Sequence, residues 1–200
     1  MNENIESNSS TYRELLNGIP TAWADHIDFA EWIVRKKKAK VVVDLGVDYG
    51  YSTFSFAFPK IAHVYGVDCF EGDQYTGVRN TYDFVLEKQR ELGLDNITFI
   101  KSFVDDLEKT WDTPIDILHI DAFHTYDAVK NDFNKWSKFV KDDGIILLHD
   151  TLVTDHPFGV KKFFSEIELP KTNFEFCHGL GVVSKDSSLI EEIKKTFNLD

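Results

Sequence analysis

One stretch near the start of the chain restricts its fold more than any other. Residues 41–53 read Val-Val-Val-Asp-Leu-Gly-Val-Asp-Tyr-Gly-Tyr-Ser-Thr. Three β-branched residues in a row predict a strand that is buried on both faces. Gly46 and Gly50 then predict a tight turn into a helix. A strand, a glycine turn and a helix open the doubly wound nucleotide-binding folds, in which amides at the helix start face the ligand.

The glycine turn does not fit a ligand that presents phosphates to it. A dinucleotide fingerprint needs glycine at its first, third and sixth positions, which here hold Gly46, Asp48 and Tyr51. The charge of Asp48 would also repel a pyrophosphate, and the Gly-Lys-Ser/Thr of a P-loop is missing from the sequence. A ligand without phosphate at this turn is therefore favoured, and an NAD-dependent enzyme is disfavoured.

Strand-like and helix-like segments alternate along most of the chain, which favours parallel strand pairing. We predict a Rossmann-like, doubly wound α/β fold whose mostly parallel, seven-stranded sheet carries helices on both faces. Pro59 ends the first helix, and Asp142-Asp143-Gly144 predicts a turn into the fifth strand. The expected strands cover residues 40–45, 63–67, 97–100, 115–120, 145–148, 174–177 and 182–184, and the main helices cover 51–57, 81–92, 126–140, 160–167 and 189–197.

The chain has 200 residues, of which 42% are hydrophobic, and this suits one domain with a sizeable core. We expect a disordered tail over residues 1–10, and a single domain over residues 11–200 that begins with a helical cap, residues 11–38. An apolar face in that cap repeats at helical spacing, and such a face would permit a homodimer. Its members are Trp23, Ile27, Ala30 and Val34.

Charge and cysteine content exclude several classes of protein. The net charge is −12, so a partner held through its phosphate backbone, such as a nucleic acid, is disfavoured. No apolar run is long enough to cross a membrane, and the polar N-terminus lacks a secretory signal. Cys69 and Cys177 are too few for a disulfide framework, so we expect reduced thiols in a cytoplasmic protein.

Polar groups follow each of the five parallel strands, where ligands bind in folds of this kind. Asp68 ends the second strand 22 positions after Gly46, the spacing at which an acid accepts hydrogen bonds from ribose hydroxyls. Residues 70–77 form a polar loop that is either a lid or a plain connection. The groups at the strand ends are Asp44, Asp68, Ser102 with Phe103, Asp121 with His124, and His149 with Asp150.

The fourth and fifth strand ends together offer a candidate metal site. Asp121, His149 and Asp150 supply two carboxylates and an imidazole, and oxygen ligands of this kind favour Mg²⁺ while the imidazole leaves Mn²⁺ or Fe²⁺ open. His124 is a candidate general base, because a histidine can accept a proton near neutral pH. His119 lies within an apolar strand and is assigned to the core.

These motifs resemble one family in particular. Asp44, Gly46 and Gly50 resemble the first motif of the class I S-adenosylmethionine (AdoMet)-dependent methyltransferases. Ile-Asp-Ala-Phe-His-Thr-Tyr at 120–126 and Leu-His-Asp-Thr at 148–151 are similar to the branch that contains macrolide and aminocoumarin sugar O-methyltransferases and cephalosporin-hydroxylase-like proteins. The likeness runs from residue 41 to residue 151, with Ala122 and His149 at positions where the branch usually has glycine and an acid.

The resemblance implies O-methylation of a small hydroxylated substrate, such as a sugar or sugar nucleotide, assisted by a divalent cation. It implies Asp121, His149 and Asp150 as metal ligands, with His124 and Asp121 as catalytic residues. Two alternatives remain: a metal-dependent oxygenase-like enzyme on the same fold, and a binding module without catalysis, suggested by Asp48. The expected AdoMet contacts are Asp44, Gly46, Tyr49, Gly50, Ser52, Asp68, Cys69, Phe70, Ser102, Phe103 and Asp121.

Overall fold

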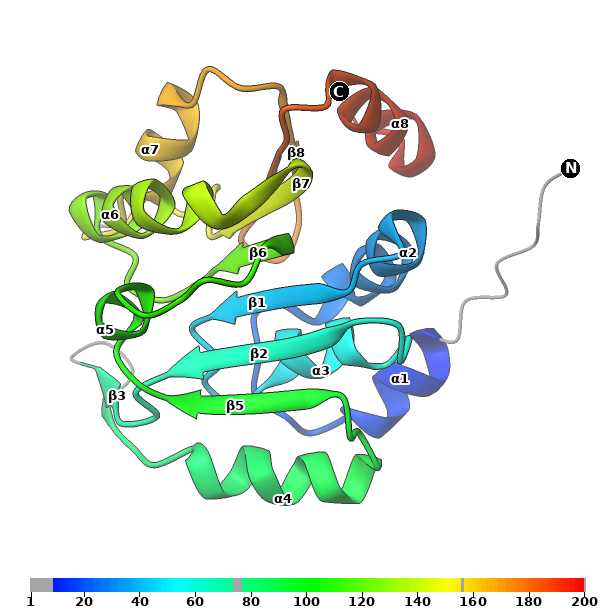
Figure 1. Cartoon of the computed structure of the whole chain (residues 1–200), viewed down its shortest axis with the longest axis vertical. Coiled ribbons are helices and arrows are strands. Elements are labelled where there is room, and N and C mark those ends of the chain that lie inside the picture. The colour runs from blue at the N-terminus through cyan, green and yellow to red at the C-terminus, as the bar shows by residue number, and fades with distance from the viewer. Residues whose placement is uncertain (1–8, 74–76, 156, 200) are drawn as a thin grey trace, which may run out of the picture.

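The computed structural model describes residues 9–73, 77–155 and 157–199. Within these residues one seven-stranded sheet has the order β5-β2-β1-β6-β7-β9-β8, and a small hairpin pairs β3 with β4 (Figure 1). The first five strands of that order run parallel. β9 pairs antiparallel with both β7 and β8, so within this sheet only β9 runs in the opposite direction. The strands are β1 (Val41–Leu45), β2 (His63–Asp68), β3 (Gly72–Asp73), β4 (Gly77–Val78), β5 (Ile97–Lys101), β6 (Ile115–Ile120), β7 (Val140–His149), β8 (Lys171–Phe174) and β9 (Leu180–Val183).

Helices cover both faces of the sheet, as predicted. Alternate residues of each strand enter two separate hydrophobic clusters: Val42 packs on one face with α2, α3 and α8, and Val43 packs on the other with α6 and α7. Full burial of each such side chain contributes roughly 1.5–3 kcal/mol. The main helices are α2 (Ile27–Lys37), α3 (Tyr51–Ala57), α4 (Tyr82–Leu92), α5 (Val104–Glu108), α6 (Tyr126–Trp136), α7 (Val160–Glu166) and α8 (Ser187–Phe197).

The glycine turn between β1 and α3 explains why both of its glycines are needed. Gly46 has φ +92°, and a Cβ at this position would lie 2.1 Å from the carbonyl oxygen of Asp121. Gly50 has φ +84° and caps α3. Only glycine lets the turn approach the end of β6 so closely, so the turn and the candidate metal site are brought into contact by the backbone itself.

The cap before the sheet is less regular than predicted. It consists of α1 (Ser9–Leu15), the short 3-10 helix η1 (Ala24–His26) and α2. Ser9 and Ser10 belong to α1, and the rest of the expected tail, residues 1–8, lies outside the described residues. The predicted apolar face is buried inside the chain, so it offers no surface for a homodimer.

Three boundaries were wrong. Asp142-Asp143-Gly144 lies within β7, where the pairing with β6 shifts register, and makes no turn. The helix expected over 126–140 ends at Trp136 and passes through the 3-10 helix η2 (Ser137–Phe139) into β7. The strand expected over 174–177 is β8, three residues earlier.

Among the described residues, the helices are all too short or too polar to cross a membrane.

A buried carboxylate, Asp44, connects the glycine turn to the rest of the fold. Its Oδ2 accepts hydrogen bonds from the hydroxyls of Ser52 (2.7 Å) and Thr53 (2.5 Å) at the start of α3. Its Oδ1 lies 2.7 Å from Nδ1 of His119. The indole of Trp23 donates to Nε2 of His119 at 3.2 Å, so the imidazole hydrogen lies on Nδ1 and is donated to Asp44. His119 is fully buried, as its assignment to the core predicted.

Replacing Asp44 should therefore destabilise the whole domain. In Asp44→Asn the charge-assisted hydrogen bonds from Ser52, Thr53 and His119 are replaced by weaker neutral ones, and an NH2 turned toward His119 would face another donor. We expect the free energy of unfolding to fall by about 3 kcal/mol, measured by urea denaturation. Asp95→Asn, at an exposed position, is the matched control and should change it by less than about 0.5 kcal/mol. Equal stability of the two variants would show that the Asp44 contacts do not hold the fold.

Candidate active site

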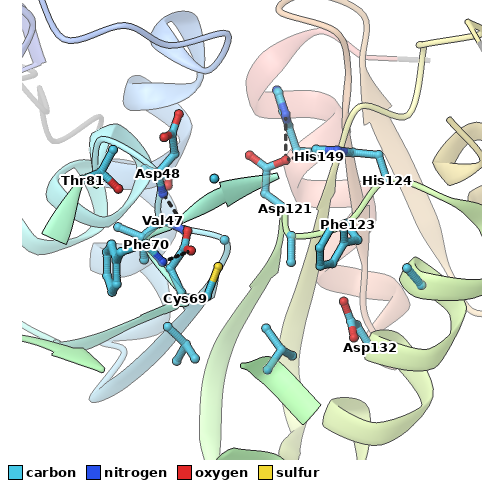
Figure 2. A pocket seen from close by; sticks show the side chains of 18 of the residues that line it. Val47, Asp48, Cys69, Phe70, Thr81, Asp121, Phe123, His124, Asp132 and His149 are labelled. Atoms are coloured by element: carbon cyan, nitrogen blue, oxygen red, sulfur yellow. Dashed lines mark hydrogen bonds and ion pairs between the residues drawn. The ribbon is translucent and has the colours of Figure 1, made fainter. Parts of the chain in front are cut away.

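A cavity of about 890 Å³ opens at the carboxyl ends of the parallel strands. Figure 2 shows its two sides, with the glycine turn and the end of β2 facing the Asp121–His124 loop and α6. Asp44 is buried beneath the turn and does not line the cavity, and neither does Gly50. The predicted site residues that line it are Gly46, Tyr49, Ser52, Asp68, Cys69, Phe70, Ser102, Phe103, Asp121, His124, His149 and Asp150.

Asp68 lies where the ribose-binding acid was predicted, and it also holds the glycine turn. Its Oδ2 accepts hydrogen bonds from the amides of Val47 (2.8 Å) and Asp48 (2.9 Å). Its Oδ1 accepts one from the amide of Phe70 at 2.7 Å. These three amides hold the Asp68 carboxylate between the glycine turn and the segment after β2, at the wall of the cavity.

Asp48, the residue that breaks the glycine pattern, takes a left-handed conformation with φ +48°. Aspartate tolerates this region better than most residues, which explains how it can replace a glycine. Its carboxylate pairs with the guanidinium of Arg79 at 3.0 Å, and Arg79 lies over the ring of Tyr49 at 5.3 Å. The pair joins the turn to the segment that follows β4, and it neutralises the charge that argued against ligand binding.

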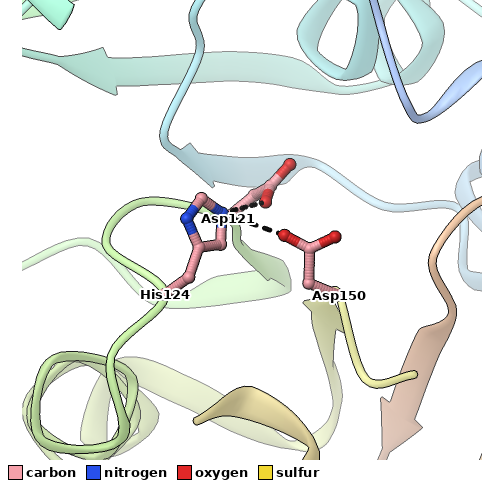
Figure 3. Close-up of side chains that lie close together, drawn as sticks. All are labelled: Asp121, His124 and Asp150. Carbon is pink, nitrogen blue, oxygen red and sulfur yellow. Dashed lines mark hydrogen bonds and ion pairs between the residues drawn. The ribbon is translucent and has the colours of Figure 1, made fainter. Parts of the chain in front are cut away.

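The acid and histidine residues of β6 and β7 converge on one another. Nε2 of His124 lies 3.2 Å from Oδ1 of Asp121 and 3.1 Å from Oδ2 of Asp150 (Figure 3). These three residues can offer ligand atoms that all lie within 4.8 Å of one another. Oδ1 of Asp150 is buried and accepts no hydrogen bond from the described residues, although Nδ1 of His178 lies 3.3 Å from it within ion-pair distance. Buried unsatisfied oxygens are costly, so this cluster is arranged to accept a further cation or donor.

His149 lies behind this group. Its Nδ1 is 3.3 Å from Oδ1 of Asp121 and 3.4 Å from Oδ1 of Asp150. Its Nε2 lies 2.9 Å from the carbonyl oxygen of Cys177, to which it can donate. The ring is 3% exposed, whereas a fifth of the His124 side chain is exposed. His124 therefore faces the cavity more openly than His149 does.

The opposite charges in this cluster shift one another's protonation. Burial opposes charge on every member, but the neighbouring carboxylates outweigh it for the histidines, raising the pKa of His149 to about 9 and the pKa of His124 above its usual value. Burial would also raise the pKa of Asp121, yet the imidazoles of His149 and His124 hold that pKa far below its usual value. Burial and the charge of Asp121 raise the pKa of Asp150. One carboxylate is thus firmly ionised beside a basic histidine.

Several lining residues were not predicted from the sequence. Pro20, Thr21 and Trp23 bring the N-terminal cap to the cavity, Arg79 comes from beyond the hairpin, and Asp132 comes from α6. Asp132 stands next to apolar positions of an amphipathic helix, so its spacing carried no functional signal. For Arg79, the only signal in the sequence was its position directly after the glycine-containing loop. Gln74, Tyr75 and His156 lie outside the described residues.

Solved structures share this fold. An O-methyltransferase from Bacillus cereus, in complex with S-adenosylhomocysteine, aligns with a TM-score of 0.68 and 16% identity over 91% of this chain and 94% of that one. The O-methyltransferase TomG from Streptomyces achromogenes, in complex with S-adenosylmethionine, aligns with a TM-score of 0.63 and 13% identity over 90% of each chain. At these identities the likeness concerns the fold.

Curated relatives also match the sequence. Uncharacterized protein y4gI of Sinorhizobium fredii is 31% identical over 82% of this chain, and uncharacterized protein R132 of Acanthamoeba polyphaga mimivirus is 31% identical over 46% of it. The chain spans 19% of the length of the first relative and 42% of the second. A family model described as a methyltransferase domain matches residues 43–151, more than half of the chain, and the protein belongs to that methyltransferase family.

Proposed function

We propose that this protein is an AdoMet-dependent O-methyltransferase that acts on a small hydroxylated substrate, such as a sugar or sugar nucleotide. The observation that carries the proposal is the continuity of one cavity from the glycine turn and Asp68 to the Asp121–His124–Asp150 cluster. One end offers backbone and acid for a nucleoside, and the other offers groups that can move a proton. The sugar rests on the resemblance of the motifs around Asp121 and His149.

The cofactor would lie along the turn, with its methionine part against residues 46–50 and its ribose at the carboxylate of Asp68. Ser102 and Phe103 stand at the end of β5 for the adenine. The solved relatives bound to S-adenosylmethionine and S-adenosylhomocysteine support this cofactor. The pairing of Asp48 with Arg79 removes the charge that favoured a non-catalytic binding module.

Titration of S-adenosylhomocysteine into the protein by calorimetry tests the cofactor. We expect micromolar binding by the wild type, and weaker binding by at least tenfold in Arg79→Ala, because the turn then loses the partner that compensates Asp48. Arg90→Ala is the control, since Arg90 lies on α4 outside the cavity. Failure of the wild type to bind would refute the proposed cofactor.

His124 is proposed as the general base. Its ring stacks on Phe158 at 4.7 Å, and its backbone carbonyl accepts a hydrogen bond from Gly159 at 2.7 Å. These contacts hold the imidazole at the cavity wall beside Asp121. The imidazole would take the proton of the substrate hydroxyl. The hydroxyl oxygen would bond to the methyl carbon as the bond from that carbon to the sulfonium sulfur breaks, and S-adenosylhomocysteine would leave. Alignment of the two reactants would supply much of the rate.

The pH dependence follows from the direction of the His124 shift. Only neutral imidazole accepts a proton, and its pKa lies above 6.5, so the rate should rise with pH above that value and level off when His124 has lost its proton. His124→Ala should lower kcat by about 10²–10⁴-fold and remove this rise. His63 lies at the start of β2, away from the carboxyl ends of the strands. His63→Ala should therefore retain the wild-type kcat and its rise with pH. A wild-type profile that does not rise would refute His124 as the base.

The residues present fit a divalent cation. Asp121 brings a partly exposed carboxylate next to the buried carboxylate of Asp150, and imidazoles lie beside both. Asp121 and Asp150 would hold the ion, with His149 as the expected third ligand and His124 also within reach. When bound, such an ion lowers the pKa of a substrate hydroxyl. The oxygen-rich set favours Mg²⁺ or Mn²⁺.

Cation affinity separates the two histidine roles. Titration of Mn²⁺ into the purified protein, followed by calorimetry, should give binding that Asp150→Asn weakens at least tenfold. If His124 is the base and His149 the ligand, His124→Ala keeps the affinity and His149→Ala loses it. The reverse pattern would exchange the two roles. Wild-type turnover that chelators leave unchanged would exclude the cation from the reaction, and iron found in the purified protein would favour the oxygenase-like alternative.

Other properties fit the proposed enzyme. Cys69 and Cys177 are both free thiols, which supports a reducing, cytoplasmic environment. The net charge of −12 supports a small-molecule partner over a nucleic acid.

A further inference from the structure

One end of the cavity lies away from the acid and histidine cluster and is built differently from it. It is bounded by the loop after β5, the residues after Asp121 and the inner side of α6. Its apolar lining includes Val104, Phe123 and Ala128, and Asp132 lies at its far side (Figure 2). A narrow region with apolar sides and a polar group beyond them suits a flat aromatic heterocycle.

Asp132 carries a buried carboxyl group that forms no direct ion pair with any of the described residues. It is 6% exposed, and Nδ2 of Asn131 donates a long hydrogen bond to its Oδ1 at 3.5 Å. Lys135, on the same helix, directs its ammonium to Asp105 at 3.0 Å. An amphipathic helix gains nothing from a buried carboxyl without a strong partner. A role toward a ligand accounts for its position.

The surroundings keep this carboxyl protonated to an unusual extent. Burial raises the pKa of Asp132 to about 7, the charge of Asp105 on α5 adds to the effect, and Asn131 and Lys135 only partly oppose it. Asp106 and Asp127 also line the cavity. A protonated carboxyl presents one donor and one acceptor side by side, whereas an ionised one presents only acceptors.

Adenine presents the complementary pair of groups. Its 6-amino group is a donor and the adjacent ring nitrogen N1 is an acceptor, about as far apart as the two oxygens of a carboxyl group. With the ribose at Asp68 and the adenine passing Ser102 and Phe103, this edge of the base points away from the ribose, toward α6. Asp132 lies apart from Asp121 and His149 in Figure 2, so the reacting methyl group would lie at the cluster end of the cavity.

We propose that Asp132 recognises the adenine of the cofactor, its carboxyl group donating a hydrogen bond to N1 and accepting one from the 6-amino group. The inference rests on the proposed function, since it assumes AdoMet as the ligand. It assigns Asp132 to cofactor specificity and gives it no part in methyl transfer.

The test measures the dissociation constants of two probes by calorimetry between pH 6 and pH 8.5. One probe is S-adenosylhomocysteine, and the other is its analogue with hydrogen in place of the 6-amino group. The proteins are the wild type, Asp132→Asn and Asp132→Ala, with Asp112→Asn as a charge-matched control at an exposed position outside this cavity. Asparagine keeps one donor and one acceptor at every pH, and alanine keeps neither.

The wild type should bind S-adenosylhomocysteine more weakly as pH rises through about 7, approaching tenfold per unit, because the ionised carboxyl no longer donates. Asp132→Asn should lack this loss of affinity. The ratio of the wild-type dissociation constant to that of Asp132→Asn at each pH therefore separates the effect of Asp132 from that of every other titrating group. Asp132→Ala should bind at least tenfold more weakly than the wild type at pH 6. Removal of the 6-amino group should weaken binding about tenfold in the wild type and hardly at all in Asp132→Ala.

Folding is checked separately. Asp132→Asn removes a buried group that must ionise, so its thermal midpoint at pH 8 should equal or exceed that of the wild type. If the wild type binds S-adenosylhomocysteine but both Asp132 variants share its affinity, its pH profile and its response to the 6-amino group, the inference is overturned and the proposed function stands. If no protein in the series binds S-adenosylhomocysteine, the proposed function is overturned and this inference with it.

Discussion

The buried carboxylate of Asp44 is the constraint on which the rest of the site depends. It receives hydrogen bonds from α3 and from His119 on β6, and His119 in turn holds Trp23 of the N-terminal cap. β1, α3, β6 and the N-terminal cap are therefore held together around one buried carboxylate. Because β1 and β6 are locked together just below the turn, Gly46 can press against the carbonyl of Asp121. The cofactor side and the chemical side of the cavity are aligned by this contact.

Much of the fold could be predicted because its pattern is local. The β-branched run at β1 and the apolar run at β6 are buried on both faces, and the predicted bounds of β6 match the structure. The errors arise where tertiary contacts override local preference. Asp142, Asp143 and Gly144 look like a turn, yet pairing with β6 holds them in a strand. The five residues of α5 are too few to show a helical period.

The candidate site could be predicted only as far as topology determines it. Parallel strands end at one edge, so Asp68, Asp121 and Asp150 were expected to meet there, and they line one cavity. The sequence does not say how side chains divide the contacts, however. Asp44 was expected at the ligand and is buried beneath it, while His124 joins the two carboxylates more closely than His149 does. Arg79 and Asp132 reach the cavity through packing that no spacing rule describes.

The cavity shows how an acid-rich protein can hold several carboxylates in one place. Each acid is balanced in a different way: Asp48 by Arg79, Asp68 by backbone amides, and Asp121 by the imidazoles around it. The ammonium group of Lys135 forms its ion pair with Asp105 and not with Asp132. Burial then favours the neutral form of Asp132. Because Asp132 has no ion-pair partner among the described residues, its charged form is costly and its neutral form can both donate and accept a hydrogen bond. These are the two hydrogen bonds that the neutral adenine ring would need at this end of the cavity.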